Sequence, residues 1–320
     1  MNHMTLRSER WFGVHVLANN DQDVDSLTKE IPELASTGVN VLVVEVDYNY
    51  AYSSHPELRG PDPVTRERVR ALLAECRAHD IRLIPQFQCL GHQSWGKVTF
   101  PLLDKYPQFD ETPGQFPNNE GIYCRSWCPQ HPELNGIVFS LFDELVDAFE
   151  SDALHVGMDE VFLIASEHCP RCRGRDPGEL FAKAVNDYHE HLKDRGVEML
   201  MWGDRLLDNR TTGYGMWEAS ENMTHTAVDL VPRDVVMCDW HYVTRDDYPS
   251  IPFFLGKGFR VWPSGWKDIE AVRAFIDFSR RYEDERMLGY LCTTWNAVEV
   301  GRLSRWPPLR TAAEMLSSRK

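Results

Sequence analysis

The chain has 320 residues, of which 42% are hydrophobic and 26% charged, so it is long enough for a sizeable core and shows no sign of disorder. Its net charge of −15 opposes binding to nucleic acid or to anionic membranes, and no basic patch offsets it. The N-terminus has no apolar signal-peptide stretch, and every apolar run falls short of the roughly 18 residues of a membrane span. We therefore expect a cytoplasmic protein with neither a nucleic-acid nor a membrane partner.

Short β-branched runs alternate with amphipathic helical stretches along the whole chain, which is typical of a parallel sheet covered by helices. The predicted strands span residues 12–17, 39–46, 81–87, 153–157, 197–202, 235–240, 259–262 and 288–294. The clearest helical faces lie within residues 65–79, 132–149 and 181–192.

The first predicted strand is followed by Ala-Asn-Asn-Asp at residues 18–21, so the glycine-rich phosphate turn of an open doubly wound sheet is missing. Eight strand–helix units instead predict an α/β fold, a (β/α)8 TIM barrel that occupies residues 1–320 as a single domain. The connection at residues 91–130 is unusually long, and loops of that length are generally functional.

Active sites of such barrels lie at the carboxyl ends of the strands, where this sequence places carboxylates beside aromatic rings. Carboxylates accept hydrogen bonds from hydroxyl groups, and flat rings stack on the C–H faces of sugars, so the site suits carbohydrate. The predicted substrate-binding residues are His15, Asp47, His92, Trp202, Asp204, Trp240, Tyr242, Trp262 and Trp295. The alternative for the tryptophans is that they fill the barrel rim, and a structural role is equally open for the polar members of the set.

The strongest signal is His-Val-Gly-Met-Asp-Glu at residues 155–160, where a hydrophobic strand ends in two consecutive carboxylates. Carboxylates that flank a glycosidic bond normally come from different strands, about 5–9.5 Å apart. Consecutive ones make sense if a 2-acetamido group of the substrate is itself the nucleophile. We therefore predict Glu160 as the general acid/base and Asp159 as the group that orients the acetamido N–H; His155 either supports these carboxylates or serves a buried hydrogen-bond network.

At this motif the sequence resembles the family 20 glycoside hydrolases, the β-N-acetylhexosaminidases, whose signature is His-x-Gly-Gly-Asp-Glu, with Met158 in place of the second glycine. Similar stretches occur in the family's order at residues 40–47, 85–92, 128–133 and 202–204. The resemblance implies a retaining exo-enzyme that removes terminal N-acetylglucosamine or N-acetylgalactosamine from an oligosaccharide or glycoconjugate. It implies an oxazolinium intermediate and no cofactor for catalysis.

Several positions depart from the family's pattern. His15 stands where an arginine grips the outer hydroxyls, Gln86 and Gln88 stand where acids are usual, and Trp-Asn-Ala at residues 295–297 replaces Trp-x-Glu, with Glu299 displaced by two. A barrel glycosidase for another terminal sugar and a non-hydrolytic carbohydrate-binding relative therefore stay open. A homodimer stays open as well, because we expect the chain to lack the N-terminal accessory domain common in the family.

Two cysteine pairs fall in loops that are neighbours on a barrel rim, and together they suit a tetrahedral structural zinc. The predicted ligands are Cys124, Cys128, Cys169 and Cys172. Free thiols or an oxidised pair are the alternatives.

Overall fold

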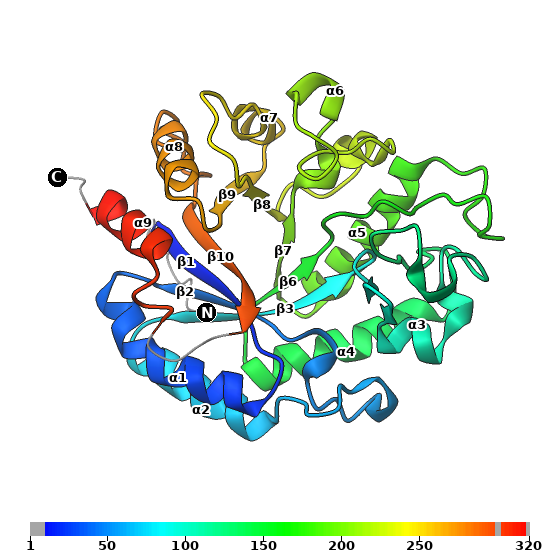
Figure 1. The fold of residues 1–320 in the computed structure, drawn as a ribbon, viewed down its shortest axis with the longest axis horizontal. Coiled ribbons are helices and arrows are strands. Elements are labelled where there is room, and N and C mark those ends of the chain that lie inside the picture. Colours follow the sequence, from blue (N-terminus) through cyan, green and yellow to red (C-terminus); the bar gives the residue numbers. More distant parts are fainter. Residues whose placement is uncertain (1–9, 298–301, 318–320) are drawn as a thin grey trace.

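The computed structural model describes residues 10–297 and 302–317 and confirms the predicted barrel (Figure 1). Eight parallel strands close on themselves in the order β1-β10-β9-β8-β7-β6-β3-β2. Every predicted strand corresponds to a strand of the barrel. They are β1 (Trp11–Leu17), β2 (Val41–Glu45), β3 (Arg82–Cys89), β6 (Ala153–Gly157), β7 (Glu198–Trp202), β8 (Val236–Trp240), β9 (Arg260–Gly265) and β10 (Gly289–Ala297).

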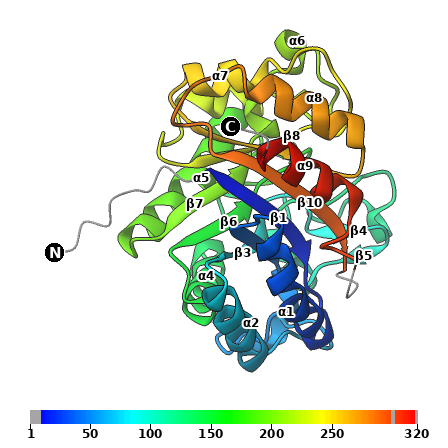
Figure 2. The same ribbon diagram turned by 90° about the vertical axis from the view of Figure 1, so that its left-hand side faces the viewer.

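Helices surround the barrel, with α1 and α2 on one side and α7 and α8 on the other (Figure 2). The outer helices are α1 (Asp21–Ser36), α2 (Arg66–Ala78), α4 (Leu134–Phe149), α5 (Pro177–Asp194), α7 (Ser250–Gly256), α8 (Ile269–Ser279) and α9 (Pro307–Ser317). The unit after β7 instead has the one-turn helix α6 (Asn209–Thr212) and a 3₁₀ helix (Thr224–Asp229). In residues 10–297 and 302–317, no helix combines the length and the hydropathy needed to cross a bilayer.

Among the described residues, buried side chains fill the N-terminal half of the barrel interior, which leaves the carboxyl end as the expected place for a site. Trp262 of β9 is fully buried, packs edge-on against Trp11 at 5.1 Å and donates its indole N–H to the Trp11 carbonyl at 3.3 Å. Because Trp11 is the first residue of β1, this contact lies at the end of the barrel opposite the rim. The prediction that Trp262 binds substrate is therefore wrong.

The long connection after β3 is an ordered segment over the rim. It contains β4 (Ser94–Trp95), β5 (Val98–Thr99) and α3 (Pro101–Lys105), and it lies on the right of Figure 1. Arg125 is buried at its centre, where it pairs with Asp110 and donates to Asn119 Oδ1 at 2.6 Å. Its other nitrogen donates to the carbonyls of residues 115 and 116, so a single side chain fixes four points of the loop.

Candidate active site

The backbone after β6 turns sharply enough to present two consecutive side chains at the rim. Gly157 has φ +66° and Met158 and Glu160 have φ +78° and +48°, all in the left-handed region. A Cβ at Gly157 would lie 2.1 Å from Gln88 Oε1, so this position requires glycine for space as well as for conformation. The buried His155 supports the turn by accepting the Gly157 N–H at Nδ1, 3.1 Å away.

Asp159 is buried and held in one orientation. The amide of Gln88 donates to its Oδ1 at 2.7 Å, and His92 Nε2 lies 3.4 Å from its Oδ2. Burial acts to raise the pKa of this carboxyl, but the charge of His92 and the hydrogen bond from Gln88 outweigh it and hold the pKa below its usual range. Asp159 is therefore ionised at neutral pH.

Glu160 is the second carboxylate of the turn, and His92 lies between it and Asp159. His92 Nε2 is 3.1 Å from Glu160 Oε2. Burial acts to lower the pKa of His92, but the Asp159 charge raises it well above its ordinary value. His92 is thus a cation at neutral pH and balances the carboxylates. Burial and the nearby Glu160 carboxylate raise the pKa of the half-buried Tyr123 hydroxyl, so it stays protonated and can donate a hydrogen bond.

The backbone of Glu160 is fixed by a buried ion pair at the end of β7. Its N–H donates to Asp204 Oδ2 at 3.0 Å, and the same oxygen accepts from Arg205 Nε at 2.6 Å. The indole of Trp240 donates to Asp204 Oδ1 at 3.2 Å. Burial raises the pKa of Asp204 to about 6, against the effect of Arg205, which leaves it ionised at neutral pH. Asp204 and Trp240 therefore lie at the site, but their polar atoms position Glu160.

Two carboxylates, Glu45 at the end of β2 and Asp47 in the 3₁₀ turn after it, form a hydrogen-bonded support for the site. Asp47 accepts the Gln88 N–H at 2.7 Å, and Glu45 accepts from Gln86 Nε2 at 2.6 Å. Burial raises the pKa of Glu45 to about 7, and burial together with the nearby Glu45 charge raises that of Asp47 well above its ordinary value. Asp47 thus acts on Asp159 through Gln88.

His15 does not offer a free nitrogen to a sugar, contrary to its predicted role. It is fully buried, with Nδ1 3.1 Å from the Thr294 carbonyl and Nε2 2.9 Å from Glu45 Oε2. Burial lowers the pKa of His15 to about 4, so the ring is neutral. Since Nδ1–H donates to the carbonyl, the lone pair of Nε2 accepts a hydrogen bond from the Glu45 carboxyl in its protonated form.

Aromatic rings line the floor and one wall. Trp202 is fully buried between the rings of His15 and His155, at 5.7 and 4.4 Å, and belongs to the floor. Trp295 and Tyr242 are partly exposed, and the Trp295 indole donates to the Tyr242 hydroxyl at 3.0 Å. They form the wall that a sugar can reach. The side chain of Asn296 and all of Glu299 lie outside the described residues.

A cluster of four rings that the sequence did not indicate stands beside Glu160. Tyr123 makes edge contacts with Trp95 at 5.5 Å, Phe162 at 5.7 Å and Trp217 at 4.8 Å. Trp95 and Trp217 are 59% and 42% exposed, although large apolar side chains are normally covered. Arg205 donates to the carbonyls of residues 216, 217 and 219, so the loop that carries Trp217 is tied to the ion pair behind Glu160.

The predicted four-cysteine set needs one correction. Cys128, Cys169 and Cys172 meet, but the fourth member of their cluster is Glu111. Cys124 is directed to the other side of the loop, with its Sγ 3.8 Å from the Glu160 carbonyl. Cys124 lies between Tyr123 and Arg125, which anchor its segment to the site and to the loop interior.

A closed (β/α)8 barrel with two adjacent carboxylates, a cation between them and aromatic walls at its carboxyl end belongs to the class of barrel glycoside hydrolases. The sequence matches the model of glycosyl hydrolase family 20, catalytic domain, over residues 15–297, and the chain belongs to this family. The resemblance read from the motifs is thereby confirmed.

Three similar proteins illustrate the match. A β-hexosaminidase of Akkermansia muciniphila is 32% identical over 109 residues, which are 34% of this chain and 22% of the relative. The β-hexosaminidase subunit beta of Mus musculus is 23% identical over 93% of this chain and 56% of its own length. The Flavobacterium johnsoniae chitobiase structure has a TM-score of 0.69 at 18% identity, over 95% of this chain and 47% of that one. The chain thus spans about half of the latter two relatives and less of the first.

The left-handed backbone at Met158 gives a stability prediction. Met158→Ala and Met158→Gly both remove the buried side chain, but only glycine relieves the positive φ. We expect the glycine variant to be more stable than the alanine variant by about 1 kcal/mol. Urea denaturation of the two variants measures the difference, and equal stabilities would show that the turn is unstrained.

The cation between the carboxylates gives a prediction about ionisation. His92→Asn leaves burial to act on Asp159 without the imidazolium, so the pKa of Asp159 should rise. The titration of Asp159, followed by ¹³C NMR of its carboxyl carbon, should move to higher pH. His79→Asn, a change at the end of α2, should leave it in place. An unchanged titration in the His92 variant would mean that the imidazolium does not set the charge of Asp159.

Proposed function

We propose that the chain is a retaining exo-β-N-acetylhexosaminidase that releases terminal N-acetylglucosamine or N-acetylgalactosamine by substrate-assisted catalysis. The observation that carries the proposal is the pair Asp159 and Glu160 on one turn, both facing the His92 cation. A pair placed this way is suited to act on one side of a sugar ring, where the substrate supplies the attacking oxygen.

The other acids at the rim have positioning roles, which leaves the chemistry to this pair. Glu45 and Asp47 are bonded to Gln86 and to the backbone of Gln88, and Asp204 is paired with Arg205. A carboxylate whose oxygens are already engaged is a poor nucleophile, because its hydrogen bonds must break before it attacks. This supports an internal nucleophile from the substrate.

In the proposed reaction the acetamido carbonyl oxygen attacks the anomeric carbon while Glu160 gives its proton to the departing glycosidic oxygen. The C–O bond to the aglycone breaks and an oxazolinium ion forms. Ionised Asp159 accepts the acetamido N–H and offsets the positive charge that develops on the nitrogen. Glu160 then removes a proton from water, which attacks the anomeric carbon, opens the ring and restores the acetamido group with retained configuration.

The proposed nucleophile can be tested by choice of substrate. The protein should hydrolyse an aryl 2-acetamido-β-glycoside and spare the matching aryl glucoside, because only the former contains the attacking oxygen. Hydrolysis of sugars without the acetamido group would favour a glycosidase of other specificity. Tight binding of acetamido sugars with no turnover would favour a binding protein.

Substitution of Asp159 or Glu160 should lower kcat far more than substitution of a nearby carboxylate outside the site. We expect Asp159→Asn and Glu160→Gln to lower kcat by roughly 10²–10⁴-fold, the usual contribution of a positioned acid or base. Glu167→Gln, at an exposed position in the same loop, should leave kcat unchanged. If Glu160→Gln hydrolysed a substrate with a poor leaving group at the wild-type rate, Glu160 would not be the general acid.

The four-ring cluster beside Glu160 is placed to hold the aglycone, because the acid must lie next to the leaving oxygen. Trp217→Ala should raise KM for a β-linked acetamido oligosaccharide several-fold, in line with about 0.5–1.5 kcal/mol for a ring contact, and leave the methyl glycoside unaffected. Met216→Ala is the control, since Met216 is the adjacent residue and 41% exposed but has no ring. Equal effects on both substrates would exclude an aglycone role.

A further inference from the structure

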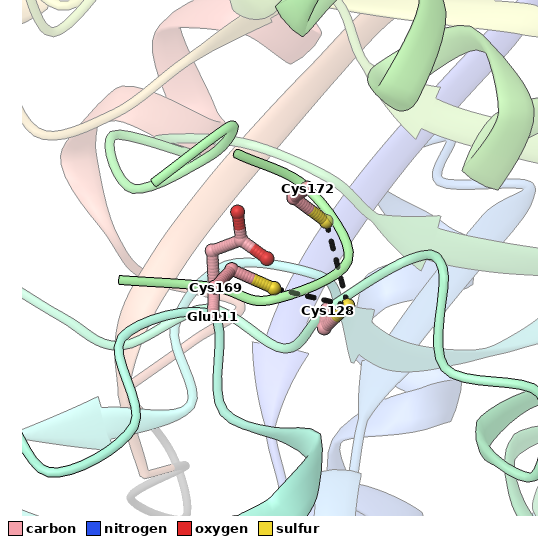
Figure 3. Close-up of side chains that lie close together, drawn as sticks. All are labelled: Glu111, Cys128, Cys169 and Cys172. Atoms are coloured by element: carbon pink, nitrogen blue, oxygen red, sulfur yellow. Dashed lines mark hydrogen bonds between the residues drawn. The ribbon is translucent and has the colours of Figure 1, made fainter. Parts of the chain in front are cut away.

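Three thiols and one carboxylate meet between the two loops that border the catalytic turn. Glu111 and Cys128 come from the connection after β3, and Cys169 and Cys172 come from the loop after β6 (Figure 3). The Sγ of Cys128 lies 3.4 Å from that of Cys169 and 3.4 Å from that of Cys172. One ligand atom from each of the four residues lies within 4.8 Å of every other, and all four residues are buried.

The carboxylate of Glu111 is incompletely satisfied by protein atoms. Its Oε1 accepts the Ser166 N–H at 2.9 Å, while the buried Oε2 has no hydrogen-bond partner among the described residues. A fully buried carboxylate is costly unless a cation or several donors compensate it, and thiols are weak donors. One carboxylate oxygen of Glu111 points toward the sulfurs, so a cation at their centre would compensate the buried carboxylate (Figure 3).

We propose that Cys128, Cys169, Cys172 and Glu111 bind a structural Zn²⁺ ion. Zinc takes four protein ligands in a tetrahedron and prefers thiolate sulfur together with a carboxylate oxygen or imidazole nitrogen. With Zn–S bonds of about 2.3 Å, tetrahedral sulfurs lie about 3.8 Å apart, so the 3.4 Å separations here need only a small expansion. A disulfide would require about 2.05 Å.

The proposed ligands saturate the ion, which gives it a structural role. Four protein ligands leave no open position for water or substrate. The ion would join the loop that carries Tyr123 to the loop that follows Glu160. It would thereby fix the donor beside the acid/base without touching the substrate.

Metal content of the full-length protein, purified without chelator, tests the proposal directly. We expect about one zinc per chain by elemental analysis, and loss of zinc in the Cys169→Ser, Cys172→Ser double variant. Cys124→Ser is the matched control, because Cys124 is a buried cysteine of the same loop outside the cluster, and it should retain the zinc. If Cys124→Ser lost the zinc while Glu111→Gln retained it, the proposed set of four ligands would be wrong.

Cobalt supplies a readout that does not depend on how the variants fold. Replacing zinc with Co²⁺ in the wild-type protein should give the thiolate charge-transfer and tetrahedral d–d absorption bands of a three-sulfur site. Reduced protein that holds no zinc and takes up neither metal would overturn the proposal, as would a mass two hydrogens low that maps to a disulfide between two of these cysteines.

The test is independent of the proposed hydrolytic function. An inactive protein that holds one zinc would support the zinc site and contradict the proposed hydrolytic function. An active protein that holds no metal would support the hydrolytic function and contradict the zinc site. A chelator should lower the Tm of the wild-type protein and leave that of the double cysteine variant unchanged, because an ion that binds only the folded state stabilises it.

Discussion

The position of His92 between Asp159 and Glu160 is the interaction on which the rest of the site depends. Carboxylates in consecutive residues repel each other whenever both are charged, and near a protein surface two unit charges 4 Å apart interact by about 4 kcal/mol. One imidazolium within 3.4 Å of both reduces that repulsion without moving either carboxylate out of the site. The backbone brings these side chains together by adopting the left-handed conformation in both segments, with φ +53° at His92 and φ +48° at Glu160.

The strained backbone conformations at the strand ends are held by networks of hydrogen bonds rather than by single contacts. Gln88 connects Asp47 to Asp159, and Arg205 connects the Asp204 that holds Glu160 to the loop carrying Trp217. Asp159 and Glu160 therefore each have their own support from a different part of the barrel. Conformations that cost about 1–3 kcal/mol each persist only where the surroundings fix them in this way.

Periodicity predicted the barrel, but not the depth of each residue within it. Trp262 was placed at the rim because its strand was expected to end there, whereas β9 continues to Gly265 and leaves that ring near the opposite end. Asp159 and Glu160 were predictable since they follow a strand that ends as expected. Glu111 and Tyr123 were not, because the long connection has no repeating pattern that reveals which side chains face inward.

Two departures from the family's pattern have one physical explanation. An arginine at the end of strand one would oppose the negative charge of acids on strand three, and here both are replaced by neutral groups, a histidine and two glutamines. Replacing acids by glutamines on strand three also puts hydrogen-bond donors where an ionised acid would offer only acceptors. Gln86 and Gln88 each donate an amide N–H to a carboxylate, which an ionised acid cannot do. Losing the arginine alone would have left buried negative charge unopposed, so the exchanges are best understood as a single change that keeps the floor of the site neutral while Asp159 stays ionised.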